Sequence, residues 1–297
     1  MEPFLKQVLE DIKNYADEPS DSVKYTDNWL YSQIGREAAT LHQQAVAQSH
    51  LLFYATQTYM VGEGQSRFYL PGNLQKVLFA QRVDSTGRGL STIYPASDAG
   101  LPGISLVGPY EFTIVPAPSP GSKFELAYQR KAITHLFYGP TNADTETATI
   151  TLTLSELSGS AELTPNYYLG SYLRVVESSN QSLIGVLGRI MAVSVSGGVL
   201  SLTTDKSLGE LVPEDTVVEI IPEVPENHWD AIAWGVVRKM KNASGDKQVM
   251  AQVLLEYKTA LHLYLQSMAS IQGRSGNRVY GAWPQTYQDE VWDERVP

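Results

Sequence analysis

The 297-residue chain contains no cysteine, and this absence excludes disulfide bonds, thiolate metal ligands and a cysteine nucleophile. Its five histidines are scattered, and none stands in the HxH or HExxH spacing of a histidine metal site. The sequence therefore predicts neither a bound metal nor a cofactor.

Long apolar runs are also missing. No stretch approaches the ~20 apolar residues of a membrane-spanning helix. The opening segment MEPFLKQVLEDIKNYADE is acidic and amphipathic, whereas a signal peptide has a basic start and an apolar centre. We therefore expect a soluble protein that is made in the cytoplasm and does not associate with membranes.

Positive charge is scarce. The formal net charge is −10, and the Lys and Arg residues are too dispersed to form a nucleic-acid-binding stripe. Broad affinity for a phosphate backbone depends on clustered Lys and Arg, so specific nucleic-acid binding is not expected.

Catalytic motifs are absent as well. The chain has no G-x-S-x-G, Walker A or G-x-G-x-x-G pattern. Its densest acidic stretch has neither the spacing of a calcium loop nor a clear carboxylate pair, so an acid/base hydrolase is the weakest of three functional interpretations. That stretch comprises Glu210, Glu214, Asp215, Glu219, Glu223 and Glu226. We do not predict an enzyme.

The clearest pattern present is a helical hairpin from about residue 226 to 268. Apolar residues recur at helical spacing in both arms, which predicts two helices with apolar seams. They are Trp229, Ile232, Ala233, Val236, Val237 and Met240 in the first arm, and Val249, Val253, Leu254, Tyr257, Leu261, Tyr264, Leu265 and Met268 in the second. The same periodicity predicts helices over residues 2–15 and from 26 or 27 to 50.

The middle of the chain has the sequence pattern of β structure, with short β-branched and aromatic runs between turn residues. Residues 84–108 are rich in Gly, Pro and Ser and are expected to be a long surface loop. The predicted strands cover residues 51–60, 67–71, 75–83, 110–115, 123–129 and 131–138, and then 147–154, 167–176, 184–195, 198–203 and 216–221. The later group suggests a small barrel or sandwich.

These elements predict an α+β fold in four parts. Residues 1–50 and 226–270 form a helical bundle, residues 51–146 a β-rich extension with long loops, residues 147–222 an inserted β domain, and residues 271–297 an extended tail. The tail contains Tyr280, Trp283, Tyr287 and Trp292, together with Arg274 and Arg278. Such aromatic anchors favour docking on a partner chain, although packing on the tail's own domain stays equally open.

Three places in the sequence resemble the head-to-tail adaptor (connector) family of tailed bacteriophages. The first is Trp29-Leu30 ahead of Glu37-Ala38-Ala39, and the second is RFYLP at residues 67–71 followed by Gln75-Lys76-Val77. The third is the closing helical pair, PENHWDAIAWGVVRKMKNASGDKQVMAQVLLEYKTAL. Together they cover about half of the chain, in the family's order, and residues 147–222 then correspond to an inserted β domain.

The resemblance implies a structural virion protein of the neck or tail region, with no catalytic role. It implies a homo-oligomeric ring, by family precedent a dodecamer, that joins the portal protein to a downstream tail or nozzle protein. DNA would pass through the lumen without specific binding, and the negative charge would keep it from sticking. His228, Trp234 and Tyr264 are the candidates for the subunit interface, and the tail residues are the candidates for partner docking.

A second interpretation, from a different class, is a β-rich carbohydrate-binding module of a tail or baseplate. Exposed tyrosines would stack on sugar rings in that case, with Tyr94, Tyr110, Tyr167 and Tyr168 as the candidates.

Overall fold

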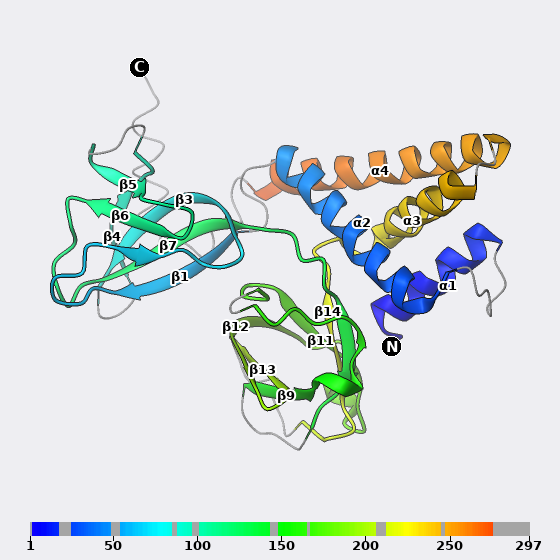
Figure 1. Cartoon of the computed structure of the whole chain (residues 1–297), viewed down its shortest axis with the longest axis horizontal. Helices are drawn as coiled ribbons and strands as arrows, with labels where there is room; N and C mark the ends of the chain where they lie inside the picture. Colours follow the sequence, from blue (N-terminus) through cyan, green and yellow to red (C-terminus); the bar gives the residue numbers. More distant parts are fainter. Residues whose placement is uncertain are drawn as a thin grey trace. The chain divides into compact units, whose positions relative to one another are not determined.

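The computed structural model describes residues 2–17, 25–48, 54–84, 88–96, 101–142, 148–164, 167–205, 212–244 and 247–275. The chain forms two compact units: residues 1–47 with 132–266, and residues 48–131 with 267–297 (Figure 1). The fold is α+β, as predicted, with helices near both ends and antiparallel sheets between them. The four-part domain division stays a prediction.

The helices of the first unit come from opposite ends of the chain. They are α1 (Phe4–Ala16), α2 (Asp27–Gln48), α3 (Trp229–Ser244) and the start of α4 (Lys247–Ser275), with the short 3-10 helix η3 (Glu226–His228) leading into α3. Helix α1 packs along α3: the rings of Phe4 and Trp229 meet edge-on at 4.7 Å, and those of Tyr15 and Trp234 stack at 4.3 Å.

The predicted apolar faces are confirmed for α1 and α3, whose periodic residues are all buried. On α2 the predicted apolar stripe is also buried, except that Trp29 at its first turn is exposed; the buried members are Leu30, Ile34, Ala38, Leu41, Ala45 and Val46. On α4 the seam is buried at Val253, Tyr257 and Tyr264, but Val249 is exposed, so its assignment to the seam was wrong. The start of α4 is therefore covered by its own unit on one side only, and Val249 lies outside that side.

A buried polar group lies where α2, α3 and α4 meet. Glu37 of α2 is fully buried; it accepts a hydrogen bond from the Tyr257 hydroxyl at 2.9 Å and pairs with Lys239 at 2.7 Å. Arg238 lies over the Tyr257 ring at 4.2 Å, and Gly235 leaves the room that the Glu37 side chain occupies. Because a buried carboxylate is costly unless it is paired, this set of contacts orients the three helices relative to one another.

A seven-stranded antiparallel sheet completes the first unit and curls into a half-barrel (Figure 1). Asn142, beyond β8, donates a backbone hydrogen bond to Thr151 of β9, which brings the two ends of the curl together. In spatial order the strands are β10 (Ser158–Gly159), β8 (Phe137–Pro140), β14 (Val217–Ile221), β11 (Tyr172–Glu177), β12 (Leu187–Ser196), β13 (Val199–Thr204) and β9 (Thr149–Thr153). Short 3-10 helices occur at Leu154–Glu156 and Gln181–Leu183.

The second unit contains two antiparallel sheets around one aromatic core. The first sheet has the order β1 (Tyr54–Met60), β7 (Lys123–Arg130), β3 (Leu74–Val83) and β4 (Gly89–Ile93). The second has the order β2 (Phe68–Tyr69), β6 (Glu111–Val115) and β5 (Gly103–Leu106). Between them Phe68, Phe112 and Phe124 pack with ring centroids 4.9 to 6.2 Å apart.

Two strand predictions need correction. Residues 84–108 are more than a loop, because β4 and β5 form there and pair with β3 and β6. Conversely, residues 131–136 are irregular, and the strand starts only at Phe137. Thr134 in this irregular segment lies against Gly35 of α2, where a methyl group added to the glycine would be 1.9 Å from the Thr134 carbonyl oxygen.

Candidate functional site

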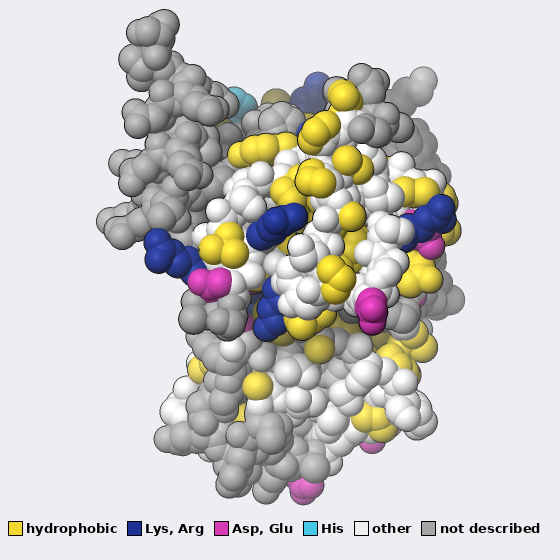
Figure 2. Space-filling model, turned by 90° about the vertical axis from the view of Figure 1, so that its left-hand side faces the viewer, with side chains coloured by type: hydrophobic (Ala, Val, Ile, Leu, Met, Phe, Trp, Pro, Cys, Tyr) yellow, Lys and Arg dark blue, Asp and Glu magenta, His cyan; other side chains and the backbone are white. Residues whose placement is uncertain are grey.

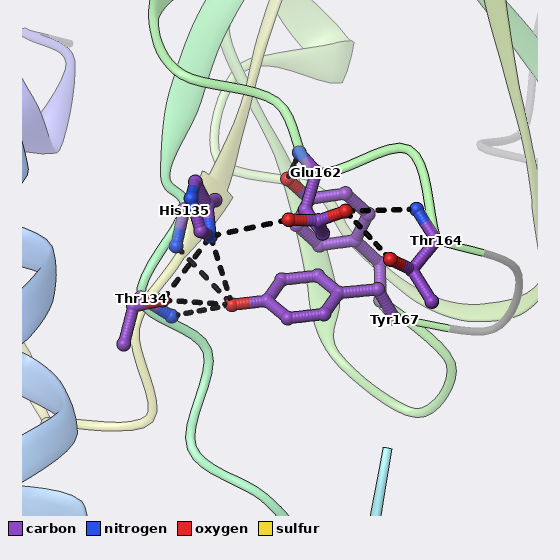
Figure 3. Close-up of polar contacts among 6 residues, drawn as sticks. Thr134, His135, Glu162, Thr164 and Tyr167 are labelled. Carbon is purple, nitrogen blue, oxygen red and sulfur yellow. Dashed lines mark hydrogen bonds and ion pairs between the residues drawn. The ribbon is translucent and has the colours of Figure 1, made fainter. Parts of the chain in front are cut away.

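The densest polar cluster in the first unit surrounds the hydroxyl of Tyr167 (Figure 3). This oxygen accepts hydrogen bonds from the backbone N–H groups of Thr134, at 2.7 Å, and His135, at 3.3 Å. It also lies 3.1 Å from the Thr134 hydroxyl. One side chain thus satisfies the backbone of a segment that has no strand partner there.

Glu162 forms the other side of this cluster (Figure 3). One of its carboxylate oxygens accepts hydrogen bonds from the Thr164 hydroxyl at 2.6 Å and from the Thr164 N–H at 3.0 Å, and the other lies 3.9 Å from His135 Nδ1. The hydrogen bonds from Thr164 stabilise the charged form and lower the pKa of Glu162. The backbone N–H of Glu162 donates to the hydroxyl of the buried Tyr168.

A threonine, a histidine and a carboxylate have the composition of a proton relay, but their geometry here is different. In a relay the nucleophile and the carboxylate contact opposite nitrogens of the imidazole. Here the Thr134 hydroxyl, at 3.1 Å, and Glu162, at 3.9 Å, both approach Nδ1 of His135. The arrangement therefore acts as a clamp that fastens residues 134 and 135 to the loop around residue 162.

This clamp makes a specific prediction. Thr164→Val removes the hydroxyl that donates to Glu162, so the pKa of Glu162 should rise toward its ordinary value of 4.5. Carboxyl-selective NMR titration measures that pKa directly. Thr259→Val is the control, because the Thr259 hydroxyl bonds its own helix and should leave the titration unchanged; an unmoved Glu162 pKa in the Thr164 variant would contradict the assignment.

The predicted acidic stretch does not gather into one site among its described residues. Glu219 pairs with Arg174 at 2.6 Å, Glu223 pairs with the buried His42 at 2.6 Å, and Glu226 lies 3.5 Å from Arg174. Asp215 accepts a hydrogen bond from Ser179. Glu210 lies outside the described residues. These carboxylates are engaged in contacts that hold the fold, and sequence reasoning missed those partners because they are distant along the chain.

The candidate interface residues are placed differently from one another. His228 is buried, Tyr264 has an exposed fraction of 0%, and their rings pack against each other at 5.7 Å. Both side chains are therefore covered by their own chain, and their role at a subunit interface stays a prediction. Trp234 is half-buried against Tyr15, and its role at an interface stays a prediction.

The tail candidates cannot be placed. Tyr280, Trp283, Tyr287, Trp292 and Arg278 lie outside the described residues, and only the backbone of Arg274 is described, within α4. Of the proposed sugar-stacking tyrosines, Tyr94 and Tyr110 are exposed, whereas Tyr168 is buried in the core and Tyr167 holds the clamp.

A second feature is the outward face of α4, which we define by Ala251, Gln252, Leu255, Lys258, Thr259, His262, Leu263 and Gln266. All of these side chains are exposed. Leu255 and Leu263 are 64% and 52% exposed, and Lys258 is the only member of the set with a permanent charge. The face is mostly polar, and its two exposed leucines make it a candidate contact surface.

Comparisons with known proteins give no family assignment. No protein-family model matches the chain, and no curated protein matches it. Within the described residues, no three His, Asp or Glu side chains are arranged to hold a metal ion. No helix in the described part of the chain has the length and hydropathy needed to cross a membrane.

Proposed function

We propose that this protein is a structural subunit of a ring that joins the portal vertex of a phage head to the tail and lets DNA pass through its lumen. The observation that carries the proposal is the outward face of α4, with two exposed leucines on a helix whose opposite side is buried. The order of the sequence motifs that resemble the adaptor family supports the same interpretation.

The α4 face suits contact between identical subunits. Burying exposed leucine surface is favourable by about 25 cal/mol for each Å² removed from water. The opposite side of α4 is already occupied by its own unit through Val253, Tyr257 and Tyr264. A helix covered on one side by its own unit and on the other by a neighbour lies at the boundary between two subunits. A repeated contact between two different surfaces forms a ring when its rotation closes.

The charge of the chain suits a DNA passage. At −10, an assembly of many copies presents a surface of the same sign as the phosphate backbone, so DNA is repelled and not retained. This part of the proposal predicts that Asp and Glu outnumber Lys and Arg around the channel; a channel lined by Lys and Arg would exclude it.

The mass of the native particle tests the ring. We expect native mass spectrometry to find a closed assembly of roughly a dozen copies, and electron microscopy to show an axial channel wide enough for double-stranded DNA. The double variant Leu255→Glu/Leu263→Glu places charges on the α4 face and should convert the assembly to monomers, because buried unpaired carboxylates are strongly unfavourable at an interface.

A matched control carries the same substitutions elsewhere on the first unit. Leu163 and Leu187 are also exposed leucines, so Leu163→Glu/Leu187→Glu should leave both the assembly and the melting temperature unchanged. A wild-type chain that stays monomeric at micromolar concentration, or an α4 variant that assembles normally, would contradict the proposal.

A further inference from the structure

Charge is divided unevenly between the two units. Residues 48–131 and 267–297, which make up the second unit, contain ten Lys and Arg against nine Asp and Glu, a net charge of +1. Residues 1–47 and 132–266, which make up the first unit, contain twelve against twenty-three, a net charge of −11. The negative charge of the chain is therefore carried by the first unit, and the β-rich second unit is almost neutral.

Large exposed apolar side chains are more frequent in this nearly neutral unit: its described residues hold eight of them, whereas the first unit, with about twice as many described residues, holds ten. Tyr69 and Tyr110 are each 75% exposed, far more than a tyrosine that packs into its own core. The larger exposed apolar side chains described in this unit are Met60, Tyr69, Leu90, Tyr94, Leu101, Leu106, Val107 and Tyr110. Figure 2 shows apolar side chains with Lys, Arg, Asp and Glu between them.

The backbone segments that carry four of these residues meet at one end of the three-stranded sheet. Tyr69 of β2 pairs with Glu111 of β6, and the next residue, Leu70, donates its N–H to the carbonyl of Tyr110 at 2.8 Å. Val107, after β5, donates its N–H to the carbonyl of Glu111 at 3.0 Å. We call the group Tyr69, Leu106, Val107 and Tyr110 the tyrosine edge.

The tyrosine edge is not a missing part of the core of its own unit. The inward residues of the same strands, Phe68, Phe112 and Ile114, are already buried together with Phe124 and Leu126. Beside the edge, Arg67 is exposed and lies 3.5 Å from Glu111. Exposed tyrosine with a neighbouring arginine is the composition typical of the energetic centre of a protein interface.

We infer that the tyrosine edge docks on the acidic unit of a second copy of this chain. The inference rests on the proposed ring and names the pairing within it. Two copies that each carry −10 repel one another, and contact between two first units would add −11 to −11. Contact between the +1 unit of one copy and the −11 unit of the next avoids that repulsion and so sets the orientation of the contact. It is also the unlike-surface contact that ring closure needs.

Photo-cross-linking in the full-length protein tests the pairing. A photoreactive phenylalanine analogue replaces Tyr69 or Tyr110 in ¹⁵N-labelled chains, which are mixed and reassembled with unlabelled chains before irradiation. We expect cross-links between labelled and unlabelled peptides, with the unlabelled partner falling in residues 1–47 or 132–266. Cross-links to residues 48–131 of the other copy, or cross-links confined to one copy, would overturn the inference.

Variants provide an independent measurement. Tyr69→Ser/Tyr110→Ser with Arg67→Glu should raise the concentration for half-assembly by at least about tenfold, which corresponds to the loss of about 1.4 kcal/mol per contact. Met60→Ser/Leu90→Ser, two exposed apolar residues of the first sheet of this unit, serves as the control and should assemble normally.

The two proposals fail in different ways. A closed ring whose tyrosine-edge variants assemble like the wild type overturns the pairing alone and leaves the ring in place. A wild-type chain that never assembles overturns both. A small open oligomer with the expected cross-links supports the pairing and excludes the ring.

Discussion

Replacing Glu219 with alanine is expected to destabilise the first unit by roughly 3–5 kcal/mol, the cost of leaving a buried charge without its partner. Glu219 on β14 pairs with the guanidinium of Arg174 on β11 and accepts a hydrogen bond from the backbone N–H of Phe4 at 2.6 Å. Its removal leaves the buried Arg174 facing Trp229, 5.3 Å away, and leaves the start of α1 without its acceptor. Urea unfolding measures the loss, and amide exchange should show α1 opening first.

A double variant separates the value of the pair from the cost of breaking it. Burial raises the pKa of Glu219, because the loss of hydration outweighs the opposing effect of Arg174. Keeping this carboxylate charged at neutral pH therefore costs folding free energy. Arg174→Met/Glu219→Leu removes both charges and should recover most of the stability. Glu226→Ala is the control: Glu226 is exposed and 3.5 Å from Arg174, so its loss should cost under about 1 kcal/mol. An equally unstable double variant would contradict this account.

Gly35→Ala is expected to destabilise the protein by roughly 2–3 kcal/mol, although alanine is normally preferred to glycine inside a helix by about 1 kcal/mol. The added methyl group would lie 1.9 Å from the carbonyl oxygen of Thr134 and 2.8 Å from its carbon. These are backbone atoms, and the Tyr167 hydroxyl holds the same residue through its N–H. Neither side can move aside without breaking the clamp.

Thermal and urea unfolding measure the effect of Gly35→Ala, with Gln43→Ala as the control. Gln43 is an exposed residue of the same helix, so its replacement should change stability by no more than about 0.5 kcal/mol. Tyr167→Phe in the Gly35→Ala background should lose less than in the wild type, because the clamp is already displaced. A stabilised Gly35→Ala variant would show that helix α2 and residue 134 are not in close contact.

Strand prediction succeeded where the chain alternates and failed where local composition misled it. Lys123 to Gln129 and Gly198 to Thr203 formed strands as predicted. Residues 84–108 read as a loop because they are rich in Gly and Pro, yet β4 and β5 form there by pairing with β3 and β6. Their strand character comes from these partners and not from their own residues.

The sequence by itself determined the helices and the apolar faces they bury, because a 3.6-residue repeat of apolar side chains is a local property. Only the tertiary structure decided which charges are paired. Arg174 and Glu219 lie 45 residues apart, and the local sequence around either residue does not indicate its partner. It also decided that His228 and Tyr264 face inward while Leu255, Tyr69 and Tyr110 stay exposed. Exposure depends on which surfaces remain uncovered once every element has packed, and this is a property of the whole fold.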